Sequence, residues 1–190
     1  MTNKSAGRPR SFEEEAVLRR ATGLFWEKGY AATSLDELLT TMGIARSSFY
    51  AIFGSKQKIL RAVLLLYTDE LVERMRAAAA TGPTPRDALV AVLEVAGCSL
   101  RPSEGCLFVN VAMELAPSDA EVRRIGQAYL GKVDDLLTSL LTQHGFTAER
   151  ASDIGGAMMA LTTGAITLRK AGASEARARA MLKVAIELMD

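Results

Sequence analysis

Apolar residues recur at spacings of three and four along all 190 residues, and no alternation of apolar and polar residues lasts long enough for a strand. This period places apolar side chains on one face of a helix, so it predicts an all-α fold. Hydrophobic residues make up 49% of the chain and charged residues 24%, which is typical of a globular protein and excludes a disordered one. Glycine, proline and capping residues divide the pattern into nine expected helices.

The expected helices form two groups. We predict a flexible basic arm at residues 1–10, a small helical domain at 11–55 and a larger helical domain at 56–190. The helix that starts near residue 56 is long, and it should connect the two domains.

Capping residues indicate where individual helices begin. Ser34 followed by Glu37 is a capping-box pattern, and Ser118, directly after a proline, is expected to cap the helix that follows it. Gly43 should end the helix that begins at Ser34.

Residues 34–53 hold two short helical patterns on either side of that glycine. Two short helices joined by a tight turn and braced by a preceding helix are the plan of a helix-turn-helix DNA reader. Phe49 and Phe53 lie four residues apart and should both turn inward, while Tyr50 lies about 100° around the helix from Phe49. The plain alternative is a compact helical hairpin with an ordinary solvated face.

The expected outer face of residues 45–53 carries groups that suit DNA. Arg46 can pair with guanine or with a phosphate, and the two serines after it are small enough to allow close approach. The Tyr50 hydroxyl suits a phosphate oxygen, and Lys56 at the start of the next helix is a phosphate anchor. Because the net charge of the chain is only +1, this local arrangement, and not the overall charge, indicates double-stranded DNA as a partner.

The segment GRPR near the N-terminus is a second basic feature. Arg8 and Arg10 flank a proline that keeps the backbone extended. An extended arm of this kind fits a narrow minor groove, where arginine is favoured electrostatically. An ordinary disordered tail is the alternative.

The stretch AVLRRATGLFWEKGYAATSLDELLTTMGIARSSFYAIFGSKQKIL resembles the N-terminal domain of the TetR/AcrR family of bacterial transcriptional regulators. The points of likeness are the phenylalanine before EKGY, the TSLDEL start, the GI turn, SFY, and F followed by SK. The resemblance implies a homodimeric, ligand-responsive repressor of a near-palindromic operator. It implies DNA contacts at these positions: Thr33, Arg46, Ser47, Ser48, Tyr50 and Lys56.

Three positions depart from the family pattern. Ala45 stands where a capping residue is frequent, and a lost cap typically costs about 1 kcal/mol, so the helix that follows should be looser before DNA binds. Ala51 and Ile52 stand where an aromatic and a histidine are frequent. Isoleucine cannot donate a hydrogen bond, but it can touch a thymine methyl group. These departures affect the operator sequence more than the class of activity.

Cys106 lies at the expected start of a short helix. The positive end of a helix dipole favours the anionic form of a thiol and makes it more reactive. A Gly-Cys-Leu sequence at this place resembles a TetR subgroup in which some members sense oxidants or electrophiles through a cysteine. The alternative is that Cys106 packs as a small apolar residue. Cys98 could meet it only if the intervening loop folds back.

The resemblance also implies a ligand pocket in the second domain. The low count of charges on the apolar stripes there favours an apolar or weakly polar inducer, and a sensing Cys106 would suit an electrophilic one. Plain core is the alternative for each of the candidates to line the pocket, which are Leu66, Val92, Cys106, Phe108, Asn110, Met113 and Tyr129. Small residues spaced by four, with apolar neighbours on the last two helices, predict a four-helix homodimer interface. Its candidates are Gly156, Ala160, Leu161, Gly164, Leu168, Met181, Leu182 and Ala185.

A different class of function, an enzyme, finds little support. His144 is the only histidine and is expected at a helix end, and paired carboxylates, a metal-ligand cluster and a phosphate loop are all missing. A thiol-dependent enzyme would need a base beside Cys106, and a helical protein-interaction module would not need the outer set around Arg46. We therefore expect a regulator and not an enzyme, with no metal and no cofactor.

The polar N-terminus and the lack of a long apolar run predict no signal peptide, no membrane partner and a cytoplasmic location.

Overall fold

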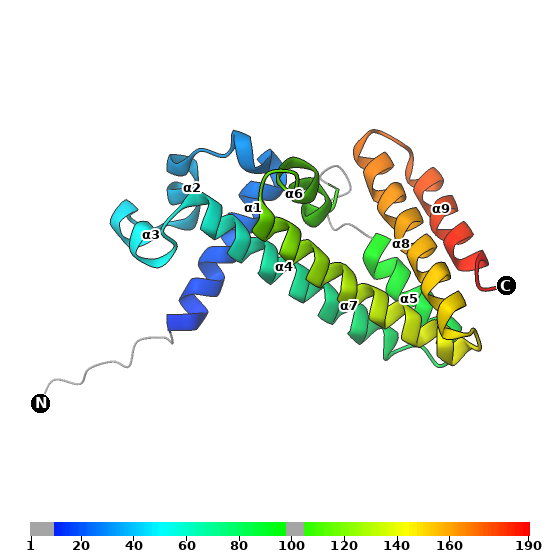
Figure 1. Cartoon of the computed structure of the whole chain (residues 1–190). Helices are drawn as coiled ribbons and strands as arrows, with labels where there is room; N and C mark the ends of the chain where they lie inside the picture. The colour runs from blue at the N-terminus through cyan, green and yellow to red at the C-terminus, as the bar shows by residue number, and fades with distance from the viewer. Residues whose placement is uncertain (1–9, 98–104) are drawn as a thin grey trace, which may run out of the picture. The chain divides into compact units, whose positions relative to one another are not determined.

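The computed structural model describes residues 10–97 and 105–190, with side chains from Glu14 onward. Over these residues the chain forms nine α-helices and no strand, so the predicted all-α class is confirmed (Figure 1). The helices are α1 (Arg10–Ala32), α2 (Leu35–Met42), α3 (Arg46–Ile52), α4 (Lys56–Ala79), α5 (Pro85–Gly97), α6 (Leu107–Leu115), α7 (Ala120–His144), α8 (Ala148–Lys170) and α9 (Glu175–Glu187).

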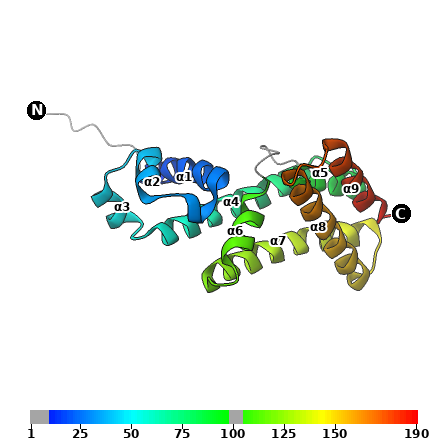
Figure 2. The ribbon, with the colours of Figure 1, turned by 90° about the horizontal axis from the view of Figure 1, so that it is seen from above.

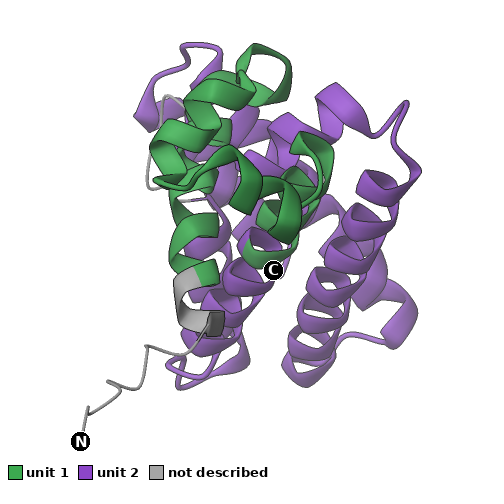
Figure 3. Cartoon of the chain, turned by 90° about the vertical axis from the view of Figure 1, so that its left-hand side faces the viewer, with its two compact units in different colours: residues 1–66 green, residues 67–190 purple. Residues whose placement is uncertain are grey.

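The chain divides into two compact units, residues 1–66 and residues 67–190 (Figure 3). The division falls inside α4, so this helix supplies its first part to the first unit and the rest to the second. Residue 56, where we expected the second domain to begin, is the first residue of α4.

The predicted capping box fixes the start of α2. The Ser34 hydroxyl accepts the backbone N–H of Glu37 at 3.2 Å, and the Glu37 carboxylate accepts the N–H of Ser34 at 3.0 Å. Gly43 ends the helix with a left-handed backbone (φ 69°), and its N–H donates to the Leu39 carbonyl at 2.9 Å. A Cβ would strain this conformation, so the glycine makes the tight turn into α3 possible.

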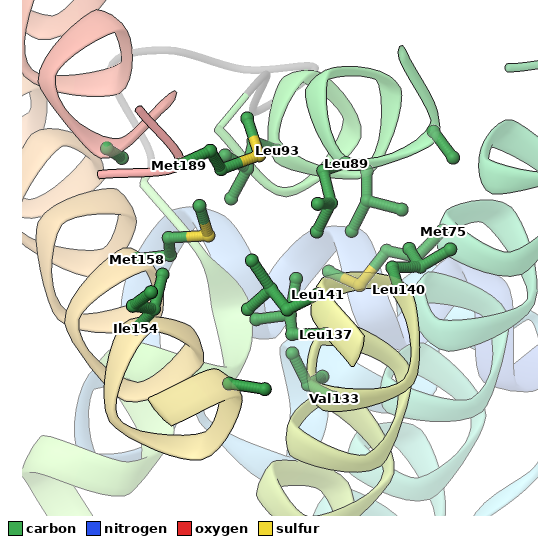
Figure 4. Packing of buried hydrophobic residues seen from close by; sticks show 14 of the residues in the cluster. Met75, Leu89, Leu93, Val133, Leu137, Leu140, Leu141, Ile154, Met158 and Met189 are labelled. Atoms are coloured by element: carbon green, nitrogen blue, oxygen red, sulfur yellow. The ribbon is translucent and has the colours of Figure 1, made fainter. Parts of the chain in front are cut away.

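The second unit has an apolar core, to which α4, α5, α7, α8 and α9 contribute buried side chains, together with Met189 just after α9 (Figure 4). In this view Leu137 and Leu141 of α7 point toward Met158 of α8 and Leu89 of α5. The last two helices, α8 and α9, pack side by side and are joined by a short turn (Figures 1 and 2).

The start of α7 corrects a prediction. Asp119, not Ser118, is the cap: its carboxylate accepts the N–H groups of Glu121 at 3.0 Å and of Val122 at 3.2 Å. The Ser118 hydroxyl instead donates to the Leu115 carbonyl at the end of α6, at 3.3 Å. Both side chains are good caps, so the sequence pattern alone does not decide between neighbours.

The start of α3 lacks a side-chain cap, as expected for Ala45. Ala45→Ser should supply one, because a serine hydroxyl can accept a backbone N–H of the first turn and typically stabilises a helix by about 1 kcal/mol. We expect amide hydrogen exchange in α3 to slow by about fivefold where opening is local. Ser34→Ala is the opposite control and should speed exchange in α2. Unchanged exchange in α3 of the Ala45→Ser protein would show that the missing cap does not loosen this helix.

Candidate nucleic-acid interface and ligand cavity

One side of α3 is buried and the other is exposed. Phe49 is fully buried and Phe53 is 7% exposed, with their ring centroids 5.8 Å apart. Tyr50 is 50% exposed and Ile52 is 52% exposed. The predicted orientation of this helix, with both phenylalanines inward and Tyr50 outward, is therefore confirmed.

The predicted DNA-facing residues of α3 are all accessible. Arg46, Ser47 and Ser48 are exposed together with Tyr50. The Tyr50 ring meets the Phe49 ring edge-on, with 5.4 Å between centroids, and this contact supports it on the surface of the helix. The result is a polar face with one arginine, which suits the base edges and phosphates of a duplex.

Lys56, the predicted phosphate anchor, is the first residue of α4. Its ammonium Nζ lies 4.2 Å from the centre of the Tyr30 ring, a cation–π contact that helps to position the charge. Tyr30 in turn lies near Phe25 of α1, with ring centroids 6.3 Å apart. Tyr30 was not among the predicted site residues, and the signal that could have indicated it was an aromatic residue near the end of a helix.

Two ion pairs join α2 to its neighbours. The Arg46 guanidinium of α3 pairs with the Asp36 carboxylate, and the Lys28 ammonium of α1 pairs with the Glu37 carboxylate. Hydrogen bonds from Lys28 and from Ser34 lower the pKa of Glu37 to about 2. Because folding lowers this pKa from 4.5, the stabilising contribution of Glu37 is complete above about pH 4.5 and is lost as the pH falls toward 2.

The structure contradicts one predicted DNA contact. Thr33 is fully buried, and its hydroxyl donates to the Gly29 carbonyl at 2.7 Å. The side chain therefore braces the end of α1 and does not face outward. Arg8 lies outside the described residues, as does the side chain of Arg10, so the minor-groove contacts stay predictions.

The second unit encloses a cavity of about 50 Å³ between α4, α5, α6, α7 and α8. Four of the predicted pocket residues are in its wall: Val92, Cys106, Phe108 and Tyr129. Other wall residues come from α4 (Leu71, Met75) and from α8 (Met159, Thr162, Thr163). The wall is mainly apolar, with thiol and hydroxyl groups at a few places, which is typical of a small-molecule site.

Three predicted pocket residues lie elsewhere. Met113 is 80% exposed, and the Asn110 side-chain oxygen accepts a hydrogen bond from the Lys170 ammonium at 2.9 Å. Leu66 is the last residue of the first unit and is not part of the wall. On a helix as short as α6 the apolar spacing did not specify which residues reach the cavity.

Cys106 occupies the cap position of α6, where it is buried and part of the cavity wall. Its sulfur lies 3.4 Å from the Tyr67 hydroxyl, and the rings of Phe108 and Tyr129 pack with centroids 4.7 Å apart. Burial raises the pKa of Tyr67 and of Tyr129 far above the ordinary value, so both phenols stay protonated at neutral pH. The second cysteine, Cys98, lies outside the described residues.

The rest of the described chain offers little other chemistry. Within residues 10–97 and 105–190, no cluster of histidine, cysteine, aspartate and glutamate could hold a metal ion. Nor is any helix of the described part long and apolar enough to cross a membrane. His144 ends α7, as predicted, and its ring lies 5.8 Å from the Phe146 ring.

Part of the predicted dimer interface is exposed. Gly156 and Ala160 lie on the exposed side of α8, and a Cβ on Gly156 would meet no atom within 4 Å. Leu168 on the same helix is 42% exposed, Val184 on α9 is 48% exposed, and Leu188, directly after α9, is 36% exposed. We call these five residues the α8–α9 surface.

Several other predicted interface residues contact their own chain instead. Ala185 is fully buried in the core. Leu182 packs against Gly97, the last residue of α5, so closely that a Cβ on this glycine would come within 2.6 Å of a Leu182 methyl group. The Met181 methyl group would lie 3.4 Å from a Cβ on Gly164, and Leu161 packs against the core. These residues form the contact of α9 with α5 and α8, so they are not all available to a partner.

Two family models match the chain. Residues 17–63 match the model described as bacterial regulatory proteins of the tetR family. Residues 85–185, more than half of the chain, match the C-terminal domain of LmrA/YxaF-like transcriptional regulators. The chain belongs to the TetR family.

Curated relatives agree with this membership. The HTH-type transcriptional repressor ComR of Escherichia coli K12 is 32% identical over 123 residues, which is 63% of this chain and 59% of ComR. The HTH-type transcriptional regulator YezE of Bacillus subtilis 168, described as uncharacterized, is 31% identical over 136 residues, 68% of each chain. The match thus spans about three fifths of ComR and two thirds of YezE.

A solved TetR-family structure extends the likeness to nearly the whole chain. A cysteine variant of the regulator CifR, solved with double-stranded operator DNA of 26 base pairs, superposes with a TM-score of 0.78. It is 25% identical, and the match covers 95% of this chain and 98% of CifR. TetR-family proteins are DNA-binding regulators, so this chain is a transcriptional regulator with a helix-turn-helix and not an enzyme.

Proposed function

We propose that this TetR-family protein is a homodimeric repressor that leaves a near-palindromic operator when a small molecule occupies its cavity. The observation that carries the proposal is the two-sided α3, with Phe49 and Phe53 buried and Arg46 and Tyr50 exposed. A helix held in this way presents polar groups to a major groove. ComR is described as a repressor, and the CifR variant was solved with operator DNA. Both relatives support a role in repression at an operator for this chain.

Most of the exposed residues of α3 have a proposed role on DNA. Arg46 pairs with a guanine or a phosphate, and Ile52 can touch a thymine methyl group. The Tyr50 hydroxyl donates to a phosphate oxygen, and Lys56 neutralises a phosphate near the start of α4. The two serines that follow Arg46 allow the helix to approach the bases closely. Thr33 is no longer in this set, because its side chain is buried.

The proposed dimer uses the α8–α9 surface. Gly156 and Ala160 have little or no side chain, so helices of two chains could approach closely there. Val184 and Leu188 would then be covered by the partner and not left in water. A two-fold dimer presents two α3 helices to half-sites about one helical turn, or a multiple of it, apart.

The proposed inducer is a compact apolar molecule. The cavity of about 50 Å³ is much smaller than the roughly 300–1,000 Å³ of most ligand pockets. Its wall therefore has to move apart to admit a ligand, and the flexible side chains of Met75 and Met159 can rearrange to allow this. Because Leu71 and Met75 belong to α4, such a movement would also shift the helix that begins at Lys56.

A second proposed route to release is modification of Cys106 by an electrophile. The thiol is in the cavity wall, so an electrophilic molecule in the cavity would lie beside it. In a conjugate addition the thiolate sulfur bonds to the electron-poor carbon, and the electron pair of the double bond takes up the proton that the thiol released. The Tyr67 hydroxyl, 3.4 Å from the sulfur, can donate a hydrogen bond to the thiolate.

Selection of bound sequences from random duplex DNA tests the DNA-reading proposal and supplies the operator. On that operator, Tyr50→Phe should weaken binding by about fivefold, the effect of one lost hydrogen bond of about 1 kcal/mol. A random duplex should lose a similar factor, because a phosphate contact carries no sequence information. Tyr129→Phe makes the same chemical change in the cavity wall and is the control. A changed base preference in the Tyr50→Phe protein would exclude a pure phosphate contact.

Ala160→Glu tests the dimer. It places a charge on the α8–α9 surface, and an unpaired charge buried in an interface should raise the dimer dissociation constant by roughly a hundredfold or more. Ala128→Glu is the matched control, because Ala128 is also an exposed alanine on a helix. Sedimentation of both proteins gives the oligomeric state. A dimer that tolerates glutamate at position 160 as well as at position 128 would move the interface elsewhere.

Cys106→Ser tests the electrophile route with N-ethylmaleimide as the probe. The reagent should release wild-type protein and the Cys98→Ser control from the operator, while Cys106→Ser stays bound. Fluorescence anisotropy of labelled operator measures the release. Release of the Cys106→Ser protein at the same reagent concentration would show that this thiol is not the sensor.

A further inference from the structure

An ion pair connects the two helices of the helix-turn-helix. The Arg46 guanidinium is paired with the Asp36 carboxylate, and 54% of the Arg46 side chain and 81% of the Asp36 side chain are exposed. Asp36 lies in the first turn of α2, and Arg46 is the first residue of α3. The pair therefore bridges the turn at Gly43, next to the face assigned to DNA.

The stability of the fold does not explain this pair. An exposed ion pair between mobile side chains adds little to stability. The start of α2 is already capped by Ser34 and Glu37, and α3 is anchored by its buried aromatic residues. Asp36 does compensate for one local cost, because the positive end of the α3 dipole disfavours a cation at Arg46.

The pair has a clear consequence for the contacts of Arg46. A phosphate is an anion, so it competes with Asp36 for the guanidinium and is repelled by the carboxylate that it displaces. A guanine edge is neutral and offers two acceptors. Because a guanidinium has five N–H donors, Arg46 can keep one hydrogen bond to Asp36 and use others for a base. Asp36 thus penalises phosphate contacts more than base contacts.

We propose that Asp36 is a specificity-determining residue, which holds Arg46 back from the phosphates of arbitrary DNA while leaving it available to a base edge. The inference depends on the proposed role of α3 in reading the operator. Asp36 acts through Arg46, so it is a positioning residue and touches no base itself. Its removal should increase non-specific binding, which is mainly phosphate binding.

Asp36→Asn tests the proposal on full-length protein, with the selected operator and a random duplex as probes. Affinity for the random duplex should rise by about two- to fivefold, the range expected of one exposed charge pair. The slope of log affinity against log salt should become steeper by about one unit, as for one added phosphate contact. The ratio of operator to random affinity should fall. Asp135→Asn is the control, because it makes the same change at an exposed position on α7.

The Arg46→Ala background separates action through Arg46 from general repulsion. If Asp36 acts through Arg46, Asp36→Asn should change random-duplex binding in the wild-type protein but not in the Arg46→Ala protein. Equal gains in both backgrounds would overturn the proposal, because they would show direct repulsion of DNA by the carboxylate. An unchanged affinity ratio and salt slope for Asp36→Asn would overturn it as well.

The same measurements distinguish this inference from the proposed function. If α3 does not read DNA, Arg46→Ala will leave the selected operator bound as tightly as before, and the proposed function fails together with the inference. If Arg46→Ala weakens operator binding but Asp36→Asn behaves as Asp135→Asn does, only the inference about Asp36 fails.

Discussion

The burial of Phe49 and Phe53 determines what α3 can present to a partner. A helix of seven residues without a side-chain cap is too short to be stable alone, so its conformation depends on packing. Each buried phenylalanine contributes about 1.5–3 kcal/mol through removal of apolar surface from water. Once both rings are inside, the geometry of the helix places Tyr50 and Ile52 outside. The accessible face of α3 is therefore a consequence of its core, and the exposed residues could change without loss of the fold.

Features that depend on neighbours in sequence were predicted correctly. The capping box of Ser34 and Glu37 and the inward direction of the two phenylalanines follow from spacings of three or four residues, and the end of α2 follows from the glycine at position 43. Errors began where two local solutions were equally good. The choice of Asp119 over Ser118 as a cap is one such case, and the inward direction of the Thr33 hydroxyl is another.

Features that depend on residues distant in sequence were not predictable from the pattern. The pairing of Asp36 with Arg46 and the contact of Lys56 with the Tyr30 ring both require the turns to bring separate helices together. The faces of α8 and α9 show the same limit, because small and apolar residues occur on more than one side of these helices. Ala160 is exposed while Ala185 is fully buried, and only the packing of α9 within its own chain distinguishes them.

The small volume of the cavity fits the proposed use of a ligand as a signal. A ligand that binds two conformations of a protein equally well shifts no equilibrium between them. In a cavity of about 50 Å³ a larger molecule binds only where the wall has moved, so its affinity must differ between conformations. Leu71 and Met75 make α4 part of that wall, and α4 begins at the lysine assigned to a phosphate. If the ligand releases the protein from DNA as proposed, the factor by which it lowers the DNA affinity is also the factor by which DNA lowers the ligand affinity, because the two would share one conformational equilibrium.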